Sequence, residues 1–110
     1  MSQLELESVV LLGFHNHRVG SFLSELCEDL GYGAVLVSSV NEMLEKIRQR
    51  EYPRYLMDLN LGKPNSLDVG AAVRVYEAVK AQIESNRAKF LGMSANPEAV
   101  EAARKLGIPA

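Results

Sequence analysis

The sequence has little cysteine and no long apolar run. Among its 110 residues there is one cysteine, Cys27, which cannot form an internal disulfide, so we expect a reducing, cytoplasmic setting. No stretch approaches the roughly 20 apolar residues that a membrane-spanning helix needs. Residues 1–8 lack the basic start and continuous apolar stretch of a secretion signal. We therefore expect no membrane association.

Basic clusters, linkers and catalytic motifs are also missing from the sequence. Its 12 basic and 14 acidic residues are scattered along the chain, which does not favour direct binding of nucleic acid. No linker composition or internal repeat divides residues 1–110, so we expect a single domain. No Ser-His-Asp order, glycine-rich phosphate loop or paired carboxylate can be found, and we predict that the protein is not an enzyme.

Apolar strands alternate with amphipathic helices along the chain. The first expected strand, Val9–Phe14, precedes a segment with apolar residues at helical spacing that ends at Gly31, a plausible cap. These apolar residues are Val19, Phe22, Leu23, Leu26, Cys27 and Leu30. We expect this helix to cover the sheet, with Phe22 as a core aromatic residue and Cys27 buried.

Three further strands and three further helices follow. The expected strands are 34–37, an apolar run at 55–61 that carries Asp58, and 89–94. The expected helices are 40–47, with a Ser39/Glu42 capping box, 69–83, and a last helix capped by Asn96. Strands that alternate with helices in this way are typical of a parallel sheet with right-handed crossovers, so we predict a three-layer α/β sandwich.

Polar side chains follow three of the predicted strands, at the point where each strand ends. They are His15 and Asn16, then Asp58 and Asn60, then Ser94 and Asn96. A carboxylate is costly to bury within a covered strand, which places Asp58 at the strand's carboxyl end. Ligands of open parallel sheets bind at this edge, so the sequence predicts a site there.

The order and spacing of these residues resemble the receiver domain of two-component response regulators, over essentially the full length. The matching segments are Met57-Asp58-Leu59-Asn60-Leu61, Gly92-Met93-Ser94-Ala95-Asn96 and the turn Gly31-Tyr32. The resemblance implies a flavodoxin-like, CheY-like sandwich that accepts a phosphoryl group on Asp58 from a histidine kinase or phosphotransfer protein. It also implies that the Ser94 hydroxyl senses this group, that Asp58 and the Asn60 backbone carbonyl bind magnesium, and that phosphorylation switches the binding of a downstream protein partner.

The chain departs from the family at the end of the first strand. The family usually has two adjacent acidic residues there to hold magnesium, whereas this chain has Phe14-His15 or, shifted by one position, His15-Asn16. His15 and Asn16 are therefore weak candidate ligands, and we expect magnesium binding to be weak or absent. His15 and His17 are also weak candidates for a transition-metal site.

A second departure is that the fifth strand, with its lysine, and the fifth helix of the family are missing from this sequence. We expect the domain to be incomplete at its C-terminus, and Lys63 is a weak substitute for the family lysine. A strand beside this gap would expose a sheet edge that could recruit a second copy, so a homodimer is possible. The segment Leu61–Gly70 is also longer than the family's usual loop, and it could bind a partner or cover the site.

Three functions remain open from the sequence. The first is a receiver that is phosphorylated on Asp58. The second, favoured by the altered first-strand residues, is a pseudo-receiver that acts as an interaction module without phosphorylation. The third and weakest is cobalamin binding, because His17-Arg18-Val19-Gly20 resembles part of a cobalamin motif.

Overall fold

A computed structural model describes residues 8–63 and 66–110 of the chain. Pro64 and Asn65, in the long loop after Asp58, lie outside the described residues. The described elements alternate from first to last: β1 (Val9–Gly13), α2 (His17–Asp29), β2 (Gly33–Val37), α3 (Val40–Gln49), β3 (Arg54–Asp58), α4 (Gly70–Glu84), β4 (Lys89–Met93) and α5 (Pro97–Lys105). None of the helices within these described residues is long and apolar enough to cross a bilayer.

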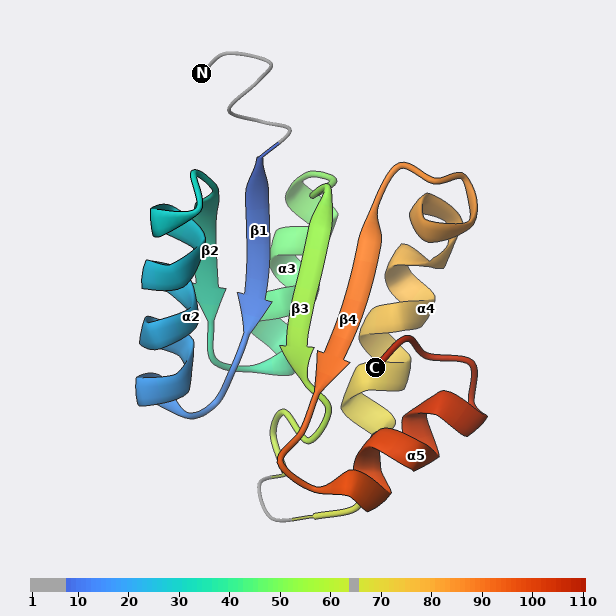
Figure 1. Ribbon diagram of the computed structural model, residues 1–110. Coiled ribbons are helices and arrows are strands. Elements are labelled where there is room, and N and C mark those ends of the chain that lie inside the picture. Colours follow the sequence, from blue (N-terminus) through green and yellow to red (C-terminus); the bar gives the residue numbers. More distant parts are fainter. Residues whose placement is uncertain (1–7, 64–65) are drawn as a thin grey trace.

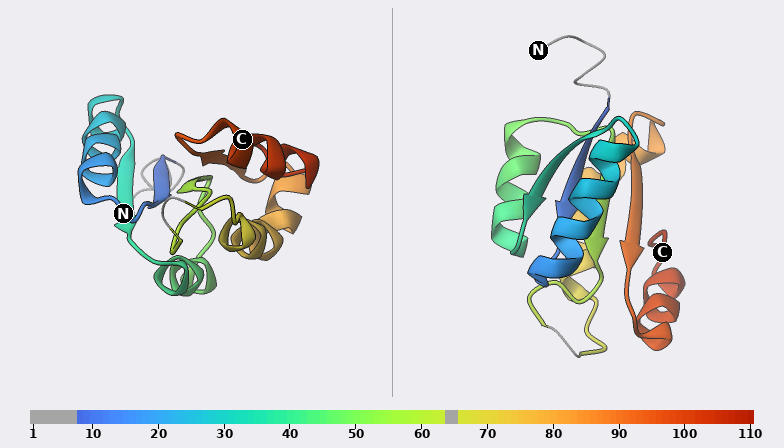
Figure 2. Two further views of the ribbon diagram at one scale, coloured as in Figure 1. Left: turned by 90° about the horizontal axis from the view of Figure 1, so that it is seen from below. Right: turned by 60° about the vertical axis from the view of Figure 1, so that its left-hand side comes forward.

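The four strands form one parallel sheet in the order β2-β1-β3-β4 (Figure 1). Helix α2 lies on one face of the sheet, α3 and α4 lie on the opposite face, and α5 lies beyond β4 (Figure 2). This arrangement confirms the predicted three-layer α/β sandwich. Because every strand points the same way, the loops that follow β1, β3 and β4 all leave from one edge.

The helix ends follow the capping chemistry expected from the sequence. The Ser39 hydroxyl accepts a hydrogen bond from the Glu42 amide at 3.1 Å, as in the expected capping box of α3, and donates one to the Glu42 carboxylate at 3.2 Å. Asn96 caps α5 through the Glu98 amide at 3.0 Å. Gly31 follows α2 with a φ of 88°, a left-handed conformation that favours glycine.

The core is divided between the two faces of the sheet. The larger cluster lies on the α3 and α4 side and contains fully buried residues such as Met57 and Val75. A smaller cluster on the α2 side is built on Val10, Leu12 and Phe14 of the first strand and its end. The main packing of the domain is therefore under α3 and α4.

The prediction that the apolar residues of α2 form a covered stripe is wrong for most of them. Val19, Phe22, Leu26 and Leu30 are 42%, 64%, 42% and 67% exposed, so Phe22 is not a core residue. Leu23 and Cys27 pack against the smaller cluster, but Cys27 is half-buried and not buried as expected. Helix α2 thus covers β1 and β2 with one edge of its apolar surface and leaves the rest exposed.

Candidate functional site

Asp58 is the last residue of β3 and is half-buried at the carboxyl edge of the sheet. Its register partner is Met93, the last residue of β4, so the following residue, Ser94, leaves the sheet beside Asp58. The Leu59 amide, directly after Asp58, donates to the Met93 carbonyl at 2.8 Å and holds the two strand ends together. The structure therefore brings Asp58 and Ser94 to one place, as the sequence predicts.

The Asp58 carboxylate is oriented by the turn that follows it. Its Oδ1 accepts a hydrogen bond from the Asn60 amide at 2.9 Å, an interaction typical of an aspartate that begins a turn. The backbone carbonyl of Asp58 accepts from the Leu61 amide at 3.1 Å. The hydrogen bond from the Asn60 amide orients the carboxylate through Oδ1, and Oδ2 is the oxygen that this turn does not engage.

Asn60 connects two loops through its side chain, a role that the sequence does not predict. The side chain is buried, with 7% of the residue exposed. Its amide nitrogen donates to the Asp68 carbonyl at 3.1 Å, and its Oδ1 accepts from the Ser94 hydroxyl at 3.1 Å. The expected metal-binding group, the Asn60 backbone carbonyl, accepts from the Lys63 amide at 2.8 Å. A carbonyl has two lone pairs, so one remains for a cation.

The Ser94 hydroxyl is committed to protein partners. It donates to Asn60 and accepts from the Asn96 amide at 3.0 Å, at the residue that caps α5. A ligand on Asp58 that needs a hydrogen-bond donor would compete with Asn60 for the Ser94 proton. The hydroxyl therefore connects Asn60, at the start of the β3–α4 loop, to the residue that caps α5.

The β3–α4 loop is held at its end by Asp68. One carboxylate oxygen accepts from the Gly70 amide at 2.8 Å, and the other pairs with the Lys63 ammonium at 2.7 Å. Two hydrogen bonds lower the pKa of Asp68, and the one from Lys63 has a larger effect than the one from the Gly70 amide. Lys63, whose side chain is 67% exposed, thus forms a surface ion pair.

The residues after β1 lie apart from Asp58 in their contacts. Phe14 is buried in the smaller cluster, and Asn16 caps α2 by accepting from the amides of Arg18 and Val19 at 2.9 and 3.2 Å. His15 is exposed. Neither Phe14-His15 nor His15-Asn16 therefore supplies a carboxylate in place of the acidic pair of the receiver family. The side-chain oxygen of Asn16 is engaged in the helix cap.

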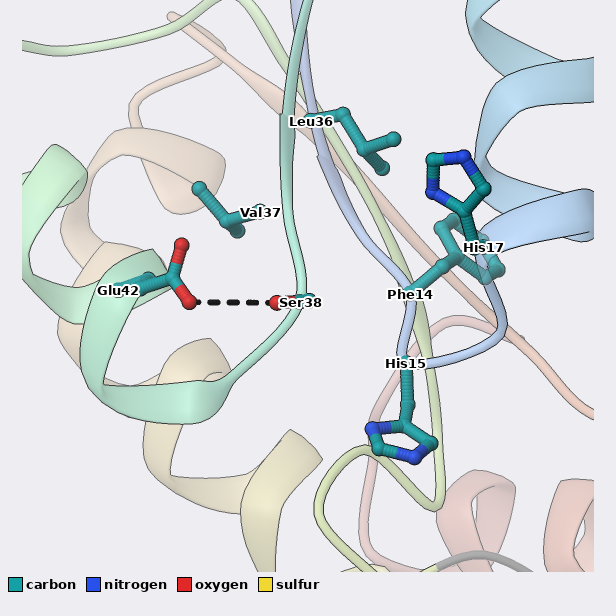
Figure 3. Close-up of a pocket in the computed structure, with 7 residues that line it drawn as sticks. All are labelled: Phe14, His15, His17, Leu36, Val37, Ser38 and Glu42. Atoms are coloured by element: carbon teal, nitrogen blue, oxygen red, sulfur yellow. Dashed lines mark hydrogen bonds between the residues drawn. The ribbon is translucent and has the colours of Figure 1, made fainter.

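A pocket of about 410 Å³ opens beside these residues, between the ends of β1 and β2 (Figure 3). It is lined by Phe14, His15, His17, Leu36, Val37, Ser38 and Glu42. Figure 3 shows the two imidazole rings pointing to different sides of the chain that leaves β1, while the Glu42 carboxylate accepts from the Ser38 hydroxyl at 3.2 Å. Within residues 8–63 and 66–110, no three His, Cys, Asp or Glu side chains form a metal-binding group.

The oxygen ligands around Asp58 fit magnesium poorly. This ion prefers octahedral oxygen coordination. The described residues offer it one carboxylate and one main-chain carbonyl, because the first strand is followed by a phenylalanine and a histidine. The site can present a nucleophilic carboxylate and a hydroxyl donor, but it lacks the clustered negative charge that usually retains a divalent cation.

Comparisons with solved structures identify the fold. A receiver domain from Methylobacillus flagellatus is 23% identical, with a TM-score of 0.62, over 86% of this chain and 79% of that one. The non-phosphorylated HemR receiver domain from Leptospira biflexa is 21% identical, with a TM-score of 0.62, over 92% and 80%. A fusion that contains part of the yeast Spc42 coiled coil is 20% identical, with a TM-score of 0.67. This match covers 94% of the present chain but 65% of the fusion protein.

No protein-family model matches the chain, and no curated protein matches it in sequence. The structural likeness is nevertheless consistent across receiver domains from several bacteria. Together with the strand order and the positions of Asp58 and Ser94, it shows that this chain has the CheY-like receiver fold.

Proposed function

We propose that this domain is a signalling receiver in which Asp58 accepts a phosphoryl group from a histidine kinase or phosphotransfer protein. The observation that carries the proposal is the position of Asp58 at the end of β3, with Oδ1 fixed by the Asn60 amide and the Ser94 hydroxyl leaving the sheet next to it. The structural neighbours support a receiver role in general.

In the proposed reaction, Asp58 Oδ2 attacks the phosphorus atom of a phosphohistidine. The new P–O bond forms as the P–N bond breaks, and the histidine leaves with its electron pair and takes up a proton from solvent. The acceptor is modified once and regenerated by hydrolysis, so the domain is a substrate of the kinase and not an enzyme for a separate substrate. Charge on the phosphoryl oxygens must be neutralised by nearby donors.

The proposed switch begins with the Ser94 hydroxyl. A phosphoryl group on Asp58 carries strong acceptor oxygens and competes with Asn60 Oδ1 for the Ser94 proton. Loss of that hydrogen bond frees one side of the Asn60 amide, whose other side holds the Asp68 carbonyl of the β3–α4 loop. Phosphorylation would thereby alter the loop and the start of α5, the surfaces proposed to meet a downstream protein partner.

Magnesium is proposed to bind weakly or not at all, because the end of β1 lacks carboxylates. The same observation favours a second candidate function, a pseudo-receiver that binds its partner without phosphorylation. The two candidates differ in one property, since only the first needs a reactive Asp58 carboxylate.

The test is phosphoryl transfer from a small donor, acetyl phosphate, followed by mapping of the modified residue. We expect Asp58→Asn to abolish the adduct while keeping the fold, because the amide preserves the shape of the side chain but is not a nucleophile. Asp29→Asn, the same change on the exposed surface of α2, should retain the adduct. An adduct that survives in the Asp58→Asn protein would refute the assignment, and an adduct lost in both variants would show that the effect is not specific to the site.

A further inference from the structure

One half of the sheet lacks a covering helix on the α2 side. Within the described residues, no helix crosses β3 and β4 on this face, except where α5 passes beyond β4 (Figure 1). Every second side chain of β3 and β4 points to this face, and these side chains are half-buried or exposed. On the other face, Tyr55 and Met57 are fully buried. They are Arg54, Leu56 and Asp58 of β3, and Lys89, Leu91 and Met93 of β4.

The bare half of the sheet is apolar in its centre and charged at its ends. Leu91 and Met93 are 48% and 38% exposed, and Leu91 is the register partner of Leu56. At the start of the strands, Arg54 and Lys89 are also register partners and form a basic end. At the other end lies the Asp58 carboxylate. We call these six residues the β3–β4 surface.

The exposed side of α2 is complementary to the β3–β4 surface. Its apolar residues, Val19, Phe22, Leu26 and Leu30, recur at helical spacing and are all exposed. Three acidic residues, Glu25, Glu28 and Asp29, follow toward the C-terminal end of the helix, and Arg18 lies near its start. The helix is therefore apolar along one side, acidic at one end and basic at the other.

The acidic end of α2 is not explained by the stability of the helix. Carboxylates near the C-terminus of a helix interact unfavourably with its macrodipole, and α2 has no basic residue in its last turn. A basic surface on a partner would compensate for this placement. Helix α2 starts at the carboxyl edge of the sheet and runs antiparallel to the strands (Figure 1). Its acidic C-terminal end therefore lies at the opposite edge, where β3 starts with Arg54 and β4 with Lys89.

We propose that two copies of this chain form a symmetric dimer in which α2 of each copy packs on the β3–β4 surface of the other. A two-fold axis parallel to the strands keeps the direction of the helix, so its acidic end meets Arg54 and Lys89 while Arg18 lies toward Asp58. An axis in the plane of the sheet but perpendicular to the strands would instead place α2 opposite α2 of the partner. The parallel axis thus brings opposite charges together, and the exposed apolar residues of both surfaces become buried together.

The test is the molecular mass in solution, measured by sedimentation equilibrium over a range of protein concentrations. We expect a reversible dimer in the unmodified protein. Phe22→Glu and Leu91→Glu should each raise the dimer dissociation constant roughly tenfold or more, because each places a charge in the apolar contact. Leu67→Glu, the same type of change at a leucine that is 53% exposed on the loop before α4, should leave the constant unchanged.

A charge exchange separates this dimer from other modes of association. Asp29→Lys should weaken the dimer without unfolding the protein, since a basic residue suits the end of a helix. Lys89→Asp should also weaken it, and the double variant should recover much of the lost affinity. A monomer at every concentration would overturn the proposal, as would a dimer that persists in both Phe22→Glu and Leu91→Glu or a charge exchange that restores nothing.

Discussion

Replacing Asn60 with alanine is expected to destabilise the domain through the loops that its side chain connects. The change removes the acceptor of the Ser94 hydroxyl and the donor to the Asp68 carbonyl, both at 3.1 Å. An intramolecular hydrogen bond contributes about 0.5–1.5 kcal/mol net, and a buried polar group left unpaired costs about 1–3 kcal/mol. Since Asp68 is exposed and Ser94 is half-buried, water can replace part of the loss. We expect a decrease of about 1–3 kcal/mol in the free energy of unfolding.

The free energy of unfolding can be measured by urea denaturation followed by far-ultraviolet circular dichroism. A matched control is Asn41→Ala, the same substitution at an exposed residue of α3, which should change stability by less than about 0.5 kcal/mol. A difference of 1 kcal/mol should lower the melting temperature by roughly 4–8 °C in a domain near this size. If the two variants are equally stable, the Asn60 side chain does not hold the loops together.

A double-mutant cycle isolates the hydrogen bond between Asn60 and Ser94. Ser94→Ala removes the donor and Asn60→Ala removes the acceptor, so the double variant should be more stable than the sum of the two losses predicts. We expect a coupling free energy of at least about 0.5 kcal/mol, as for residues in direct contact. Additive losses would show that the two side chains stabilise the domain independently.

Two further substitutions test the packing that positions the site. Tyr55→Phe should cost about 1–3 kcal/mol by urea denaturation, because the buried Tyr55 hydroxyl donates to Gln82 Oε1 at 2.6 Å and its loss leaves that oxygen unpaired; an unchanged midpoint would contradict this. Gly92→Ala should cost about 1–3 kcal/mol by thermal melting, since the added Cβ would overlap the fully buried Leu59 side chain; a rise in melting temperature would show that Leu59 has room to move.

The fold could be predicted from the sequence because its signals are local. Alternation of strand and helix periodicities fixed the element order, and residues such as Ser39, Gly31 and Asn96 marked helix ends through contacts within three positions of each other. The position of Asp58 followed from the cost of burying a charge within a strand. These inferences need no knowledge of distant contacts, and the structure confirms the fold.

The parts that the sequence did not predict depend on contacts between distant segments. Helical spacing shows that α2 has an apolar side, but it does not show whether anything covers Phe22 or Leu30, and the expected burial of Phe22 is wrong. The side-chain hydrogen bond from Ser94 to Asn60 joins residues 34 positions apart. Asparagine after a strand is common in turns, so the sequence predicted a role for its backbone and missed its amide.

Phosphorylation of Asp58 can be tested by the intact mass of the protein after incubation with acetyl phosphate, with and without magnesium. We expect a phosphoryl adduct with the lability of an acyl phosphate, removed by alkali and by hydroxylamine, that is absent from Asp58→Asn and that depends weakly on magnesium, because the end of β1 supplies no carboxylate. If no adduct forms in a sample shown to be folded, or if the adduct persists in Asp58→Asn, then Asp58 is not the acceptor. The absence of any adduct would instead favour an interaction module that works without phosphorylation.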